Sequence, residues 1–210
     1  MQRPMRAAAL RTYRELLQAA WVREVPVGPV DETLARVGRV LREADVPFAV
    51  AGGFAVIEHG YERFTKDVDL LVYAADLLRA MKALRAAGLR GGRTSIGAKL
   101  RDERTGVEVD LLGTAFEGDE RALARSVRAR GLLPVIPVVH LILMKLETGR
   151  LQDEADIVEL LKAGASPVAV GRYLRRTWPE LVPRFQKLAA RSRAERTPRP
   201  RRPPIRRKGR

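Results

Sequence analysis

Two aspartates stand in a stretch that otherwise has the pattern of a buried β-strand. Residues 67–72 are DVDLLV, so Asp67 and Asp69 alternate with apolar residues. Removing an ionised carboxylate from water is costly unless a countercharge or hydrogen bonds compensate it. Side chains alternate across a strand, so both aspartates project from one face. The segment therefore predicts a strand whose acidic side chains need a compensating partner.

A third aspartate, Asp110, lies in a second apolar segment, residues 107–112. If that strand pairs beside residues 68–72, Asp110 joins the face of Asp67 and Asp69, whose Cα atoms should be about 7 Å apart. Three carboxylates gathered there raise one another's pKa unless a cation lies between them. Magnesium prefers a few carboxylates plus substrate phosphates. The pattern predicts two Mg²⁺ ions about 4 Å apart, bound by these three aspartates.

A glycine pair precedes the acidic strand. Gly52 and Gly53 form a tight turn between an expected strand, residues 48–51, and a short helix, residues 54–59. Such a turn lets backbone amides approach an anion closely. The spacing is neither that of a Walker A loop nor that of a dinucleotide-binding fingerprint. The phosphate site is therefore inferred from its proximity to the acidic residues.

Together these residues resemble a known pattern. Gly52-Gly53, then Arg63-x-Thr65-x-Asp67-x-Asp69, then Val109-Asp110-Leu111 is similar to the minimal nucleotidyltransferase pattern of the polymerase-beta-like superfamily. The later segments HLILMKL, residues 140–146, and Arg150-x-x-Asp153-x-x-Asp156 resemble a helical part of AbiEii-like and MenT-like nucleotidyltransferases, which include toxins of toxin–antitoxin systems. The resemblance covers about residues 45–165.

The resemblance implies a role for each matching residue. Gly52 and Gly53 would hold the triphosphate of a nucleoside triphosphate (NTP), which Lys145 would also contact. Asp67 and Asp69 would bind the metal ions, and Asp110 would complete the metal site and help deprotonate the acceptor hydroxyl. That hydroxyl would attack the α-phosphorus in line and expel pyrophosphate.

One position departs from the superfamily. A serine often follows or replaces the second glycine there, whereas Phe54 follows Gly53 here. No serine hydroxyl is then available to contact the γ-phosphate, so backbone amides alone would bind it at this turn.

Several residues keep two interpretations. Arg63 and Thr65 either order the loop before the acidic strand or contact phosphate. Lys145 lies on an apolar helix, so without the resemblance it is a surface lysine whose aliphatic stem packs on the protein. Arg150 either forms a structural pair with Asp153 or faces the nucleotide.

Other polar residues are expected to be structural. Glu108 shares the face of Asp110 and is expected to be a charge at the rim. His59 and His140 are also expected to be structural. Two histidines and no cysteine argue against a zinc site.

The periodicity predicts a mixed α/β (α+β) fold. An N-terminal helix occupies residues 1–29, and residues 30–137 form the nucleotidyltransferase core, a small mixed sheet flanked by helices. This core includes a helix capped by Asp31, a hairpin around residues 103–106 and a short strand at residues 133–137. Residues 138–190 form a helical subdomain, and residues 191–210 form a disordered Arg/Pro-rich tail.

The charge suggests a nucleic-acid partner. The formal charge is +15, of which the tail carries +9. We expect an RNA acceptor such as tRNA, with a cognate antitoxin protein as a second partner. The absence of a long apolar run or a secretory signal predicts a cytoplasmic protein with no membrane association. Transfer to a protein or small-molecule hydroxyl, and a non-catalytic nucleic-acid-binding module, remain as alternatives.

Overall fold

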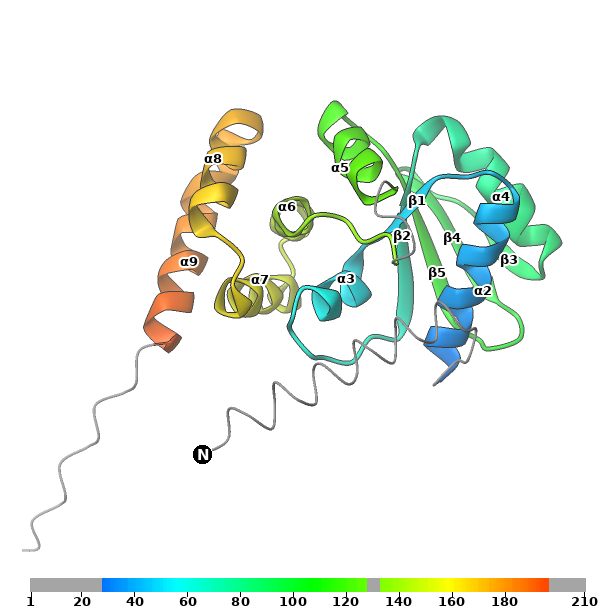
Figure 1. Ribbon diagram of the computed structural model, residues 1–210, viewed down its shortest axis with the longest axis horizontal. Coiled ribbons are helices and arrows are strands. Elements are labelled where there is room, and N and C mark those ends of the chain that lie inside the picture. Colours follow the sequence, from blue (N-terminus) through cyan, green and yellow to red (C-terminus); the bar gives the residue numbers. More distant parts are fainter. Residues whose placement is uncertain (1–27, 128–132, 197–210) are drawn as a thin grey trace, which may run out of the picture.

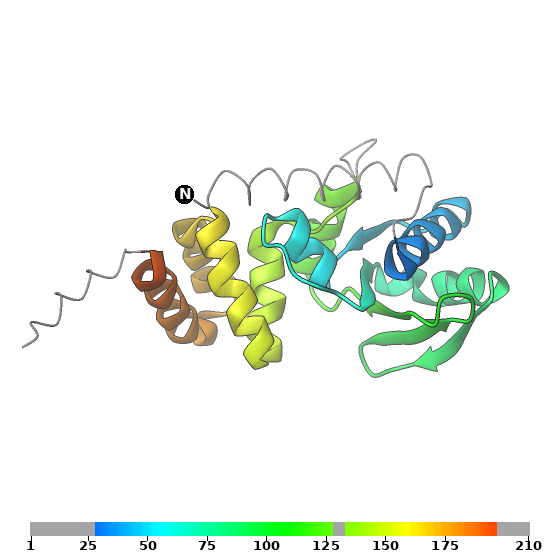
Figure 2. The same cartoon turned by 90° about the horizontal axis from the view of Figure 1, so that it is seen from below.

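The computed structural model describes residues 28–127 and 133–196. Figure 1 shows a half built on a β-sheet and a half built from helices, and Figure 2 shows the same two halves from below. The expected N-terminal helix lies outside the described residues, apart from its last two positions. The tail beyond residue 196 also lies outside them.

Five strands form one mixed sheet. They are β1 (Phe48–Val50), β2 (Asp67–Val72), β3 (Leu89–Arg93), β4 (Gly97–Asp102) and β5 (Glu108–Gly113), in the order β1-β2-β5-β4-β3. β2 and β5 are parallel, and the other neighbouring pairs are antiparallel. This arrangement confirms the expected mixed α/β fold, including the hairpin that joins β4 to β5.

Helices cover both faces of the sheet (Figure 1). The sheet half contains α2 (Pro29–Glu43), α3 (Gly52–Glu58), a 3₁₀ turn (Ala74–Asp76), α4 (Leu77–Ala86) and α5 (Glu117–Val127). The helical half contains α6 (Val138–Thr148), α7 (Leu151–Ala163), α8 (Pro167–Thr177), a 3₁₀ turn (Pro179–Leu181) and α9 (Val182–Arg196). Within the described ranges, no helix combines the length and hydropathy needed to span a bilayer.

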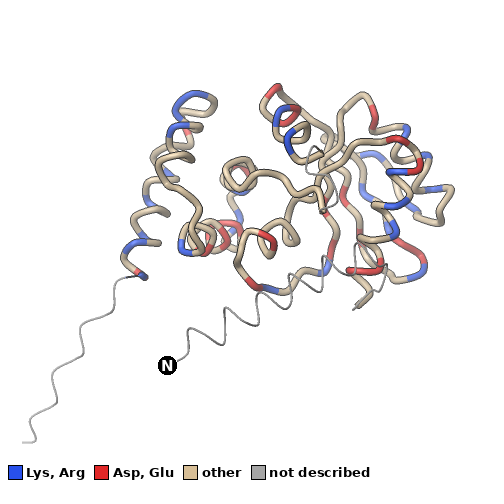
Figure 3. Tube along the Cα trace, in the orientation of Figure 1, with Lys and Arg blue, Asp and Glu red and all other residues tan. Residues whose placement is uncertain are grey.

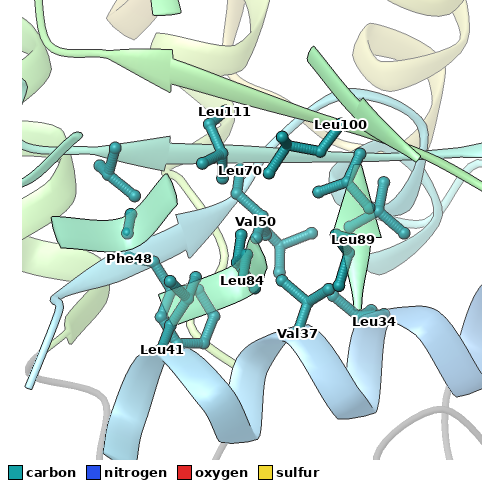
Figure 4. Close-up of a cluster of buried hydrophobic side chains, with 14 of the residues drawn as sticks. Leu34, Val37, Leu41, Phe48, Val50, Leu70, Leu84, Leu89, Leu100 and Leu111 are labelled. Atoms are coloured by element: carbon teal, nitrogen blue, oxygen red, sulfur yellow. The ribbon is translucent and has the colours of Figure 1, made fainter. Parts of the chain in front are cut away.

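The alternation along β2 divides its side chains between two cores. Val68, Leu70 and Val72 pack with α2 and α4 in the first core, which Figure 4 shows in close-up. Leu71 faces the other way, into a second core that also contains α3 and α6–α9. Asp67 and Asp69 lie on the same face of β2 as Leu71, because side chains alternate along a strand, so they face the helical half of the molecule.

The structure corrects several expected elements. α2 begins at Pro29, and Asp31 lies in its first turn without capping it. β3 was not expected, because its two central glycines disfavour a strand. The expected strand at residues 133–137 is a single bridge from Val135 to Val50. α9 continues to Arg196, so residues 191–196 are helical and not part of a disordered tail.

Candidate active site

The parallel pairing of β2 with β5 brings the three aspartates to one face. Asp69 stands directly opposite Asp110, and Asp67 stands opposite Glu108. Directly paired residues on neighbouring strands point to the same side of the sheet. The predicted pairing of these two segments, and the shared face of the three aspartates, are therefore confirmed.

These aspartates line a cavity of about 600 Å³, here called the acidic cavity. It lies where the ends of β2 and β5 meet α3, α6 and the start of α7. All nine residues singled out from the sequence line it: Gly52, Gly53, Arg63, Thr65, Asp67, Asp69, Asp110, Lys145 and Arg150. The structure thus gathers the whole candidate set around one space, while the chemical role of each residue stays a prediction.

The glycine pair leaves room for the acidic strand. Gly52 has φ +53°, and a Cβ there would lie 1.7 Å from Asp69 Oδ2. A Cβ on Gly53 would lie 2.4 Å from Thr65 Oγ1. The Gly53 backbone N–H also donates to the Asp69 carboxylate. Both glycines are therefore required sterically by their contacts with β2 and the loop before it, whatever they do for a ligand.

Thr65 and Arg63 both act on the loop before β2. Thr65 Oγ1 donates to Asp67 Oδ1 at 2.9 Å, which fixes that carboxylate at the cavity wall. Arg63 Nη1 donates to the Phe64 carbonyl at 2.9 Å. Arg63 Nε lies 3.1 Å from Asp156 Oδ1, close enough for an ion pair although not aligned for a hydrogen bond. Of the two interpretations, the loop-ordering one is visible in these contacts.

Lys145 is buried, unlike the surface lysine that its apolar helix suggests. Only 5% of the residue is exposed, and its ammonium donates to Asp153 and Asp156 at 2.7 Å each. A lysine has three N–H donors, so these bonds use two of them. Its positive charge also acts to lower the pKa of Asp69. Lys145 therefore connects the acidic strand to α7 as a shared countercharge.

Arg150 and Glu108 are both exposed, and of the two only Arg150 lines the acidic cavity. Arg150 is exposed, and its Nε lies 3.4 Å from Asp153 Oδ2, as the structural-pair interpretation expects. Glu108 accepts a hydrogen bond from Lys99 Nζ at 3.0 Å, and the same ammonium lies 3.9 Å from Asp110 Oδ1. Lys99 had no sequence signal, because only the β4–β5 register places it opposite Asp110.

Burial and neighbouring charges shift the pKa of several aspartates around the cavity. Burial raises the pKa of Asp69 to about 6, with further contributions from Asp67 and Asp110. Burial also raises the pKa of Asp110, although Lys99 opposes the shift. For Asp153 burial alone would raise the pKa, but hydrogen bonds from Lys145 and Thr148 outweigh it and lower the pKa. Asp69 and Asp110 are thus short of positive charge, whereas Asp153 on α7 is already compensated.

The strand aspartates offer carboxylate oxygens, the type of ligand that magnesium prefers. Among the described residues, no group of three or more His, Asp or Glu side chains is arranged to hold a metal ion as it stands. Magnesium commonly takes only one or two carboxylates and completes its shell with waters and substrate phosphates. The strand aspartates, with the raised pKa of Asp69, supply such oxygen ligands and would be stabilised by a cation.

The two histidines are structural, as expected. His59 Nε2 lies 2.8 Å from the Ile136 carbonyl oxygen. His140 is buried and its Nε2 lies 2.8 Å from Asp119 Oδ1. Neither histidine lines the acidic cavity.

Comparison with known proteins gives few matches. No protein-family model and no curated protein matches the chain. A solution structure of the antibiotic-resistance factor ANT(2'')-Ia aligns with 78% of this chain and 84% of its own, at 16% identity and a TM-score of 0.46. A crystal structure of ANT(2'')-Ia in complex with adenylyl-2''-tobramycin aligns with 79% and 97%, also at 16% identity and 0.46. Neither match supports the AbiEii-like or MenT-like branch, and the function is inferred below from the acidic cavity alone.

Proposed function

We propose that this protein is a magnesium-dependent nucleotidyltransferase that moves a nucleoside monophosphate from an NTP to an acceptor hydroxyl. One observation carries the proposal: Asp69 and Asp110 stand in register on parallel strands, with Asp67 on the same face, around one cavity. The raised pKa of Asp69 supports it, because carboxylates crowded in this way favour a divalent cation between them.

Each side chain has a task in this proposal. Asp67, oriented by Thr65, and Asp69 provide oxygen ligands for two Mg²⁺ ions, which when bound neutralise the charge on the transferred phosphoryl group. Asp110 accepts the proton of the acceptor hydroxyl as that oxygen attacks the α-phosphorus and pyrophosphate leaves. Lys145, with its remaining N–H, and Arg150 at the rim contact the triphosphate.

The acceptor is proposed to be RNA, such as the end of a tRNA. The net charge of +15 favours a polyanionic partner. The acidic cavity itself is indifferent to what carries the hydroxyl, so a protein or small-molecule acceptor is a distinct outcome of the same assay. We also propose a toxin role with a cognate antitoxin. Expression of the parent protein without the antitoxin should then arrest growth, whereas expression of the Asp69→Ala variant should not.

A labelling assay tests the proposal. The protein is incubated with each α-labelled NTP, Mg²⁺ and, separately, total RNA, cell protein and small-molecule hydroxyl compounds. We expect transfer to one fraction that is abolished by EDTA and by Asp69→Ala. The control is Asp76→Asn, which removes a partly buried carboxylate paired with Arg79 outside the cavity. Absence of transfer to every fraction, or an Asp69→Ala variant equal to the parent, would refute the proposal.

A further inference from the structure

A second cavity, of about 620 Å³, lies between α5, α6 and α8 and is here called the arginine cavity. It shares no lining residue with the acidic cavity. The two cavities use different residues of α6: Val139 and His140 line the arginine cavity, whereas Leu141, Met144 and Lys145 line the acidic one. Nothing in the proposed reaction uses the arginine cavity.

Four arginines from two helices line this space. Arg121 and Arg125 project from α5, and Arg172 and Arg176 from α8. Figure 3 shows basic positions on both helices. No acidic residue is part of the described lining. Arg121 pairs with Glu117 at 2.9 Å, while the other three have no ion pair within residues 28–127 and 133–196. Facing guanidinium groups repel one another, so the arrangement favours a bound anion.

The floor of the arginine cavity is held rigidly. His140 is buried and its Nε2 lies 2.8 Å from Asp119 Oδ1, while Asp119 Oδ2 accepts the backbone N–H of Ala115 at 2.7 Å. Tyr173 stands beside His140, with their ring centroids 6.4 Å apart. The Asp119 carboxylate is held by these internal partners and makes no ion pair with the four arginines among the described residues.

The arginines of the two helices converge on Tyr173. Burial raises the pKa of the Tyr173 hydroxyl, helped by Asp119, while Arg121 on α5 and Arg176 on α8 both oppose the shift. All four arginines line the same cavity as Tyr173, so they form one site instead of two unrelated surface pairs.

The spacing suits a ligand with more than one phosphate. Residues four apart on a helix are separated by about 6 Å along its axis. Guanidinium groups bind phosphate oxygens through paired hydrogen bonds. Apolar lining residues, Ala122, Pro137 and Val139, offer a surface for an uncharged part of the ligand.

We propose that the arginine cavity binds phosphate groups of a single-stranded RNA, separately from the acidic cavity. The basic surface continues beyond the cavity, since residues 167–196 carry eight Arg or Lys against two Glu. A strand that left the cavity along α8 and α9 would stay in positive potential. The choice of RNA as the source of the phosphates rests on the proposed function, whereas phosphate binding by the arginines does not.

The test is a binding measurement without Mg²⁺ or NTP, so that it is independent of catalysis. A fluorescently labelled single-stranded RNA is titrated with the full-length chain at several salt concentrations, and its anisotropy is recorded. Arg172→Ala is compared with Arg175→Ala, which removes the same charge from the same helix but lines a different pocket. Inorganic pyrophosphate is titrated in parallel by calorimetry to detect a small phosphorylated ligand.

We expect Arg172→Ala to weaken RNA binding about tenfold and to reduce the slope of log K against log salt by about 0.7. The Arg175→Ala variant, which lies outside the cavity, should weaken RNA binding much less than Arg172→Ala does. Equal losses in both variants would mean diffuse surface charge, and no loss in either would mean no contact, so both results overturn the proposal. Pyrophosphate binding that requires Arg172, with RNA binding unchanged, would keep the phosphate site and refute RNA as its ligand. A failed transfer assay with intact, Arg172-dependent RNA binding would refute only the proposed function.

Discussion

Replacing Asp69 with asparagine should stabilise the metal-free protein while abolishing transfer. In the folded chain burial raises the pKa of Asp69 from 3.8 to about 6. That difference corresponds to about 3 kcal/mol at neutral pH. Solvent in the cavity screens part of it, so we expect Asp69→Asn to raise the free energy of unfolding by about 1 to 2 kcal/mol. An asparagine carbonyl can still accept the Gly53 N–H, so the local packing is retained.

The stability gained by Asp69→Asn should depend on pH in one direction. Because the pKa of Asp69 is higher in the folded chain, the folded chain holds this proton more tightly than the unfolded chain does, and ionisation of Asp69 costs stability where the unfolded chain has already released its proton. The cost is absent below about pH 3.8, grows as the pH rises towards 6 and is complete above that. The advantage of Asp69→Asn should therefore be largest near neutral pH and disappear as the pH falls towards about 4.

Thermal unfolding in EDTA measures this effect. A gain of 1 to 2 kcal/mol predicts a Tm increase of about 2 to 8 °C near neutral pH. Mg²⁺ should raise the Tm of the parent and have a smaller effect on Asp69→Asn. The Asp76→Asn control should show neither a gain in EDTA nor a change in its Mg²⁺ response. A variant that is no more stable than the parent near neutral pH would refute the reasoning that crowded carboxylates strain this site.

Three further substitutions test the packing around the acidic cavity. Gly53→Ala should cost about 1 to 3 kcal/mol in urea unfolding, because its Cβ would overlap Thr65, whereas Gly92→Ala, with nothing within 4 Å, should be neutral within about 0.5 kcal/mol. Lys145→Met should cost about 3 to 5 kcal/mol near neutral pH, since it removes the buried ammonium that Asp153 and Asp156 share. Thr65→Val should lower kcat with little loss of Tm, because it removes a single hydroxyl whose shortest hydrogen bond orients the Asp67 carboxylate.

The sequence predicted the acidic face because two local rules suffice for it. Alternation along a strand placed Asp67 and Asp69 together, and the apolar pattern of residues 107–112 indicated the neighbouring strand. The parallel register that sets Asp110 opposite Asp69 confirmed this expectation. The helices α6 and α7 could also be predicted from the sequence, since their apolar periodicity and the glycine after α6 mark their limits.

Features that depend on tertiary contacts could not be predicted in this way. β3 carries two glycines that disfavour a strand, and it exists because β4 provides a pairing edge. Lys145 has the sequence context of a surface lysine, but α7 brings Asp153 and Asp156 to it. Lys99 gained its place beside Asp110 only through the β4–β5 register. In each case the deciding partner lies on another element, which a local pattern does not contain.

Helix α6 separates two spaces of opposite character. On one side three strand aspartates line the acidic cavity, and on the other four arginines, three of them without an ion pair among the described residues, line the arginine cavity. An RNA strand would be repelled by the acidic cavity alone and attracted by the arginine cavity alone. Cations bound at the aspartates would remove the repulsion only where the reacting phosphates lie. For an RNA acceptor, charge reversal at Arg172 should therefore raise the KM more than it lowers kcat, whereas loss of Asp110 should lower kcat.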